Sequence, residues 1–294
     1  MVTMRRFTNH AVLALVALLA AACTLTQLAY SNVSLAYNNA PPMLAWMVGD
    51  YVDMSDEQKE FVRERFGRAF AWHRQQQLPE YRRFLEGVLA QAEDHITLEE
   101  AATDHRELRG YYHRAVERLL PDMADFLLGL DSVQAKQMEK RFAKDNRKMV
   151  QDATESNGDD RLDKRVDRFV THLEQFLGSV TDEQRRMVVG YVSAQSELLE
   201  ERLADRRHRQ GAILEMVKAK PPREQVVGEL RKLFIDTESW RDPAYQRKLR
   251  NRDQALFDLI SRISVSASPE QRAAFQKRVR AFMRDIGTIT AQAS

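Results

Sequence analysis

Hydrophobic residues recur every three or four positions along most of the chain, a spacing that predicts amphipathic helices. The clearest case is 161–180, which reads RLDKRVDRFVTHLEQFLGSV. Its apolar stripe consists of Leu162, Val166, Phe169, Val170, Leu173, Phe176 and Leu177. Similar stripes occur in 62–70, 256–263 and 275–286, and no alternating run of β-branched residues indicates a strand. Because each stripe must be buried against another, we expect an all-α fold, an elongated multi-helix bundle.

Four of the expected helices begin with the same arrangement of residues. The segments MSDEQ, LDSVQ, VTDEQ and ASPEQ end at Gln58, Gln134, Gln184 and Gln271. Each has an apolar residue, then Ser, Asp or Thr, then Gln three positions later. This is the capping box, in which the cap side chain accepts a hydrogen bond from a free backbone N–H and Gln reaches back to the cap. The boxes are irregularly spaced, so a repeat of fixed period is not indicated.

Three polar or proline-containing stretches interrupt the helical pattern. They lie at 155–160 (ESNGDD), at 220–222 and near 240–243. The first separates two long helical patterns, so it is either a loop or a boundary between two halves. We favour a loop within a single α-helical domain at 41–294.

The first 23 residues have a different character from the rest. Arg5 and Arg6 precede an apolar run at 11–22, which ends in three alanines directly before Cys23, the only cysteine. This order predicts a secretory signal peptide at 1–22. Twelve apolar residues are too few for a membrane-spanning helix, which needs about 20.

Cys23 has three interpretations: a residue left at the terminus by an ordinary signal peptidase, a thiol that pairs with a partner, or a lipidation site. The segment resembles the lipobox of bacterial lipoproteins, although Ala20 stands where Leu is usual. This resemblance implies acyl chains on Cys23, a short tether at 23–40 and anchoring in a membrane. With Thr24 rather than Asp next, it implies the outer membrane of a Gram-negative bacterium, facing the periplasm.

The charges balance once the signal peptide is removed. Cleavage takes away Arg5 and Arg6 but no acid, which leaves 43 basic and 43 acidic residues. Such a surface has no net field to attract a polyanion, so nucleic acid is not an expected partner.

Two stretches near the N-terminus resemble an uncharacterised family of proteobacterial lipoproteins, recorded as a domain of unknown function. They are LAYNNAPPMLAWMVGDYVDMSDEQ (35–58) and AWHRQQQLPEYRRFL (71–85). The resemblance implies an envelope location and a helical architecture but assigns no catalytic residue. We take Trp46, Tyr51, Trp72 and His73 as the candidate interaction surface, with packing inside the helical body as the competing interpretation. The four capping boxes also resemble, more loosely, the helix starts of Spy/CpxP-type periplasmic chaperones.

Catalytic and metal-binding motifs are not evident. His95, His105 and His113 lack the three- or four-residue spacing of helical metal ligands, and no nucleophile elbow, phosphate-binding glycine loop or H-E-x-x-H occurs. We therefore predict no cofactor, no metal and no catalytic residue. The basic stretches at 202–209 and 247–252 would suit lipid phosphates, but their interspersed acids favour solvated faces.

Together these patterns predict a lipid-anchored periplasmic helical protein with a non-catalytic interaction or structural role in the cell envelope. Its partners would be the membrane, through Cys23, and an envelope protein, with no small-molecule substrate identified. A chaperone-like or envelope-stress protein that holds unfolded clients is the alternative. A peptidoglycan-active enzyme is the third interpretation, disfavoured because Glu155-Ser156 and Glu238-Ser239 lack the glycine-containing context of lytic transglycosylases.

Overall fold

The computed structural model describes residues 33–154, 158–195 and 198–292, and their regular structure is helical throughout. The expected all-α, multi-helix fold is confirmed. The α-helices are α2 (Val33–Gly49), α3 (Asp56–Trp72), α4 (Leu78–Gln91), α5 (Leu98–Leu128), α6 (Ser132–Thr154), α7 (Gly158–Leu177), α8 (Asp182–Ala194), α9 (Leu199–Ala219), α10 (Arg223–Phe234), α11 (Pro243–Ser266) and α12 (Pro269–Ala291). A π-helical turn, η2 (His73–Gln77), joins α3 to α4, and a 3-10 turn, η3 (Thr237–Ser239), precedes α11.

The N-terminal predictions fall mostly outside this description. The signal peptide at 1–22 and Cys23 lie among the residues that are not described, as do 155–157 of the expected loop. α2 begins at Val33, so the last residues of the segment predicted as a tether, 23–40, are helical. Tyr37 and Ala40 are buried in the core, which explains why these residues join the helical body. Within the described ranges, no helix combines the length and apolar character needed to span a membrane.

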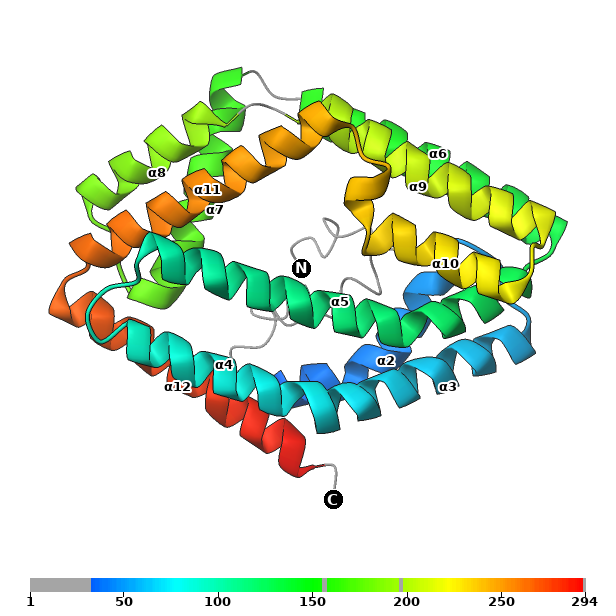
Figure 1. Ribbon diagram of the computed structural model, residues 1–294, viewed down its shortest axis with the longest axis horizontal. Helices are drawn as coiled ribbons and strands as arrows, with labels where there is room; N and C mark the ends of the chain where they lie inside the picture. The colour runs from blue at the N-terminus through cyan, green and yellow to red at the C-terminus, as the bar shows by residue number, and fades with distance from the viewer. Residues whose placement is uncertain (1–32, 155–157, 196–197, 293–294) are drawn as a thin grey trace, which may run out of the picture.

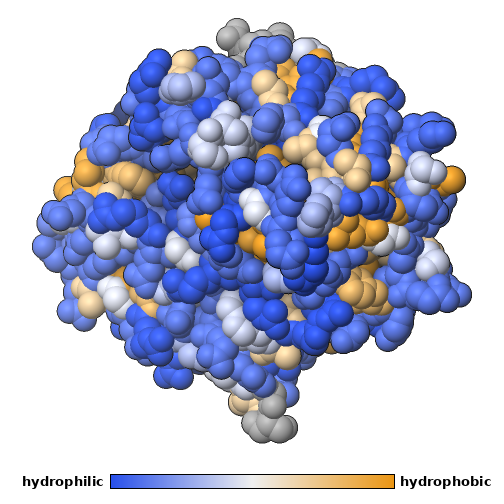
Figure 2. Space-filling view, turned by 45° about the vertical axis from the view of Figure 1, so that its right-hand side comes forward, coloured by the Kyte–Doolittle hydropathy of each residue, from blue (hydrophilic) through white to orange (hydrophobic). Residues whose placement is uncertain are grey.

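The helices form a closed circuit rather than a simple bundle of parallel rods (Figure 1). α6 packs on α9, α7 and α11 pack on α8, and both α10 and α11 pack on α5. The C-terminal helix α12 closes the circuit by packing on α2, α4 and α7. The face in Figure 2 is mostly hydrophilic, with hydrophobic residues showing in a few patches.

The hydrophobic core consists of three clusters of buried residues, each shared by several helices. One joins α5, α6, α9 and α10, and a second joins α2, α3, α5 and the end of α12. The third contains Val166, Val170 and Leu177 from the stripe predicted at 161–180, packed against α8 and α11. The 3.6-residue periodicity therefore identified the buried face of α7 correctly.

All four predicted capping boxes are present. Three consist of Ser55 with Gln58, Thr181 with Gln184, and Ser268 with Gln271, at the starts of α3, α8 and α12. The fourth precedes α6, where Asp131 accepts from the Gln134 backbone N–H (2.8 Å) and Gln134 Oε1 accepts from the Asp131 N–H (3.0 Å). A further box, Thr97 with Glu100, begins α5 and was not predicted.

The capping glutamines also meet in pairs. Gln184 and Gln271 exchange two amide hydrogen bonds of 3.0 and 2.8 Å, and Gln58 and Gln134 exchange two of 3.1 and 2.6 Å. Gln271 also donates to the Ser179 carbonyl at 2.9 Å. Each pair thus ties together the starts of two helices that are far apart in the sequence.

Candidate functional site

The four residues of the candidate interaction surface do not form a common surface. Trp46 is 70% exposed, Trp72 is half-buried, and Tyr51 and His73 are 8% and 4% exposed. The structure therefore leaves Trp46 as the solvent-facing member and places Tyr51 and His73 in the interior. The packing interpretation applies to these two.

Hydrogen bonds explain why two polar aromatic residues are buried. His73 Nδ1 lies 2.9 Å from the Tyr37 hydroxyl, and His73 Nε2 lies 3.3 Å from the Tyr81 hydroxyl. Burial lowers the pKa of His73 to about 4, so the imidazole is neutral at neutral pH. Tyr51 donates to Asp145 Oδ2 at 3.0 Å. Both side chains satisfy their polar atoms inside the protein, as buried groups must.

The most distinctive feature of the structure is a cleft of about 550 Å³ bordered by α5, α6, α9, α10, α11 and the segment before α11. These helices border the centre of the circuit (Figure 1). Seven arginines line the cleft: Arg109, Arg202, Arg206, Arg209, Arg241, Arg250 and Arg252. We call it the arginine cleft.

Helical spacing explains how the arginines reach one space. On α9, Arg202, Arg206 and Arg209 are four and then three residues apart, so they share one face. On α5, His105, Arg109 and His113 are each four apart and face the same cleft. The other arginines come from α11 and from the segment between η3 and α11.

Positive charge dominates the arginine cleft. Glu238 and Asp253 are the two carboxylates that line it. Two buried carboxylates behind the wall also contact its arginines. Asp205 lies 3.2 Å from Arg209 and 3.0 Å from Arg241, and Asp145 lies 3.8 Å from Arg206. Arginines thus outnumber carboxylates by seven to four.

Four of the seven arginines are free of carboxylate partners. In the part of the chain that the structure describes, no carboxylate lies within 4 Å of the guanidinium groups of Arg109, Arg202, Arg250 and Arg252. Arg109, Arg202 and Arg250 are exposed and Arg252 is half-buried, so water solvates them. Burial lowers the pKa of His113, and the nearby positive charge of Arg109 lowers it further.

The sequence identified this site only in part. The basic stretches at 202–209 and 247–252 contain five of the seven arginines, but their interspersed acids suggested solvated faces. Arg109 and Arg241 carried no comparable signal. Convergence of α5, α9 and α11 is a tertiary property that no local pattern reports.

The structure offers no metal centre in the described ranges, where no group of three His, Cys, Asp or Glu side chains could hold an ion. His105 and His113 line the arginine cleft with Arg109, while His95 lies 3.0 Å from Asp94 at the end of α4. The three histidines grouped by sequence therefore do not converge.

The fold and the cleft define an all-α protein with a cation-lined cavity. The chain belongs to DUF6279, a family of unknown function whose model matches residues 50–246. That span contains the arginine cleft except for its α11 wall at 249–253. Comparison with curated proteins and with solved structures gives no match. The lipoprotein motifs and the similarity to Spy/CpxP-type helix starts remain predictions.

Proposed function

We propose that this protein is a lipid-anchored, non-catalytic binding protein of the cell envelope, and that it holds an anionic ligand in the arginine cleft. The observation that carries the proposal is the concentration of seven arginines around one cavity, four of them without a carboxylate partner among the described residues. Crowded like charges repel one another, and a bound anion would relieve that repulsion.

The size and chemistry of the cavity fit this function. A volume of about 550 Å³ lies within the usual range for ligand sites, roughly 300–1,000 Å³. Guanidinium groups bind phosphate and carboxylate through paired N–H donors, which gives both strength and orientation. A cleft lined mainly by one sign of charge also raises the local concentration of the opposite charge.

The exposed face of α2 supports the proposed membrane address. Leu35, Met43 and Trp46 are 59%, 42% and 70% exposed and lie on one side of this helix. α2 begins only ten residues after Cys23, so an anchor at Cys23 would hold this face near the membrane. Tryptophan is favoured where hydrocarbon meets water.

The proposed membrane localisation is tested by replacing Cys23, the proposed anchor. In Cys23→Ser we expect loss of acylation, with the protein either unprocessed or free in the periplasm. Thr24→Ser is the matched control, because it alters the neighbouring position and keeps the thiol. Fractionation and mass measurement of the intact protein provide the readout, and normal membrane retention of Cys23→Ser would contradict the address.

Anion binding is tested separately by titrating the protein with inorganic pyrophosphate in a calorimeter. We expect binding that weakens as salt is added, because exposed charges are screened. Arg202→Gln with Arg252→Gln should reduce the affinity at least tenfold. Arg207→Gln is the control, since Arg207 is exposed on α9 but does not line the cleft. No measurable binding, or an equal loss in the control, would overturn the proposal.

A further inference from the structure

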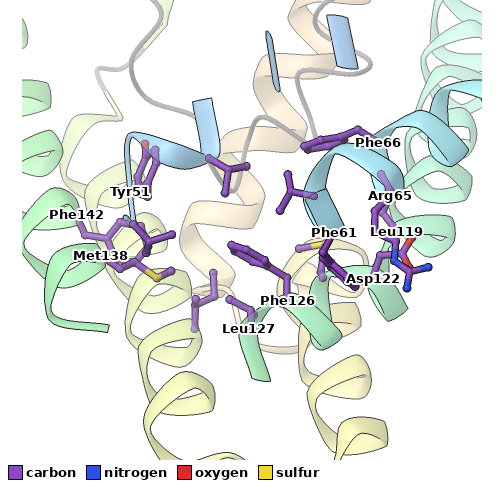
Figure 3. Close-up of a pocket in the computed structure, with 15 residues that line it drawn as sticks. Tyr51, Phe61, Arg65, Phe66, Leu119, Asp122, Phe126, Leu127, Met138 and Phe142 are labelled. Atoms are coloured by element: carbon purple, nitrogen blue, oxygen red, sulfur yellow. The ribbon is translucent and has the colours of Figure 1, made fainter. Parts of the chain in front are cut away.

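A second, apolar cavity adjoins the arginine cleft. It has a volume of about 110 Å³ and lies among α2, α3, α5, α6 and α9. Tyr51, Phe142 and Ile213 line both spaces, so these three side chains form the boundary between them. In the close-up, Tyr51, Phe142 and Met138 stand at one end of the apolar cavity (Figure 3).

The interior of this cavity is suited to hydrocarbon. Apart from two charged groups, its lining consists of aliphatic, aromatic and methionine side chains. The charged groups are Arg65 and Asp122, which lie 3.5 Å apart and are seen together at the other end in Figure 3. Asp122 also contacts Arg68 at 3.3 Å. Asp122 is thus already paired with Arg65 and Arg68, and the rest of the lining is apolar and suits a hydrocarbon group.

The cleft is lined by apolar as well as charged side chains. Besides its arginines, its walls contain apolar side chains, namely Met149, Leu233, Phe234, Ile235 and Leu249. On α9 the lining residues are Arg202, Arg206, Arg209 and Gln210, followed by Ile213 at the boundary with the apolar cavity. A ligand in this space would meet both cations and hydrocarbon, with the apolar cavity on the far side of Tyr51, Phe142 and Ile213.

Tyr51, at the boundary, makes a polar contact with its hydroxyl and an apolar contact with its ring. Its hydroxyl donates to Asp145, which in turn lies near Arg206 of the cleft. Its ring packs on Phe142, with 5.9 Å between centroids, beside the apolar cavity. The boundary is therefore polar toward the arginines and apolar toward the cavity.

We propose that the ligand of the arginine cleft is a single-chain amphipathic anion, a lipid with a phosphate head group. The arginines hold the phosphate, and the alkyl chain follows the apolar wall past Tyr51, Phe142 and Ile213 into the apolar cavity. This inference rests on the anion-binding function proposed above. One apolar cavity shares these boundary residues with the cleft, which fits one alkyl chain.

The volumes indicate how much of the chain is buried. A cavity of about 150 Å³ can hold a benzene molecule, so 110 Å³ is room for roughly four methylene-sized groups. Burial of one methylene contributes about 0.8 kcal/mol, which is about fourfold in affinity. Affinity should therefore rise by at least a hundredfold as the chain lengthens enough to fill the cavity.

The experiment is a calorimetric titration of the full mature protein with methyl, butyl, octyl and dodecyl phosphate, each below its micellar concentration. We expect the affinity to increase with chain length by at least a hundredfold overall and then to level off. Inorganic phosphate and dodecyl maltoside are the comparison ligands, which carry only the charge or only the chain. Both should bind at least a hundredfold more weakly than dodecyl phosphate.

A cavity-filling variant tests whether the alkyl chain occupies the apolar cavity. Val48 lines the apolar cavity and is only half-buried, so Val48→Phe should narrow the cavity with little effect on folding. In this variant, dodecyl phosphate should lose at least tenfold in affinity and methyl phosphate none. Arg202→Gln should instead weaken both ligands.

The outcomes separate this inference from the proposed function. Equal affinities for methyl and dodecyl phosphate would overturn the inference and leave anion binding intact. An undiminished affinity of Val48→Phe for dodecyl phosphate would also overturn it. If none of the phosphates binds, both proposals fail, and tight binding of dodecyl maltoside would indicate a neutral ligand instead.

Discussion

Buried His73 makes the stability of the fold depend on pH. Its ring is 4% exposed and lies between the hydroxyls of Tyr37 and Tyr81. Burial lowers the pKa of the imidazole from 6.5 to about 4, because the charged form loses its hydration. The contribution of neutral His73 to stability is therefore complete above about pH 6.5 and is lost as the pH falls toward 4.

The size of the effect follows from the two pKa values. Below pH 6.5 the unfolded chain binds a proton that the folded protein does not, and one pKa unit corresponds to about 1.4 kcal/mol. Between pH 7.5 and 5, the free energy of unfolding should fall by about 2 kcal/mol on account of His73. Near pH 4 the contribution of His73 to the free energy of unfolding would have fallen by about 3 kcal/mol.

Urea unfolding followed by circular dichroism, at pH 7.5, 6 and 5, measures this contribution. Carboxylates also titrate toward pH 5, so the decisive quantity is the difference in the free energy of unfolding between the wild-type protein and His73→Gln. This difference should shrink by about 2 kcal/mol over the range, since Gln cannot titrate. His172→Gln, at an exposed position on α7, should follow the wild type at every pH. A difference between wild type and His73→Gln that does not vary with pH would refute the reasoning.

Substitutions at three further places test other parts of the structure by urea unfolding at neutral pH. Lys220 adopts a left-handed conformation (φ 49°) and its ammonium donates to carbonyls at the end of α5, so Lys220→Ala should cost about 1–2 kcal/mol and Lys220→Gly less. Gln184→Leu leaves the amide of buried Gln271 with fewer partners and should cost about 2 kcal/mol. The same change at Gln58, which is only partly buried, should cost less. Arg202→Gln and Arg252→Gln should leave the stability of the ligand-free protein unchanged or higher, because like-charge repulsion is reduced. Equal losses of stability for Lys220→Ala and Lys220→Gly would contradict the first expectation, and equal losses for the two glutamine variants the second. A fall of more than about 1 kcal/mol in the free energy of unfolding of the arginine variants would contradict the third.

Local interactions explain which parts of the fold were predictable. The stripe at 161–180 and the capping boxes depend on residues within one or two turns of each other, and both were found as expected. The pairing of Gln184 with Gln271 depends on where α8 and α12 meet, and the sequence contains no trace of that contact. The capping boxes were therefore predictable one by one, whereas their pairing is determined by the assembled fold.

The candidate site was less predictable because burial is a tertiary property. Tyr51 and His73 sit in segments with aromatic and polar residues, which suggested a surface, but neighbours from other helices cover them. Tyr51 is covered by α6 and His73 by α2 and α4. Trp46 differs because its side chain remains 70% exposed, which only the assembled structure reveals.

The two buried carboxylates distinguish a binding role for the arginine cleft from a structural one. Asp205 pairs with Arg209 of the same helix and with Arg241 before α11, and Asp145 of α6 contacts Arg206, so these three arginines contribute to the fold. Arginines without carboxylate partners have no such function in the described structure, and their mutual repulsion works against folding. Arginines that destabilise the ligand-free protein are best explained by a ligand that they bind. A ligand that binds only the folded state raises the free energy of unfolding with the logarithm of its concentration. The two classes of arginine should therefore separate experimentally: substitution of the first lowers stability, and substitution of the second lowers only the stabilisation that an anion provides.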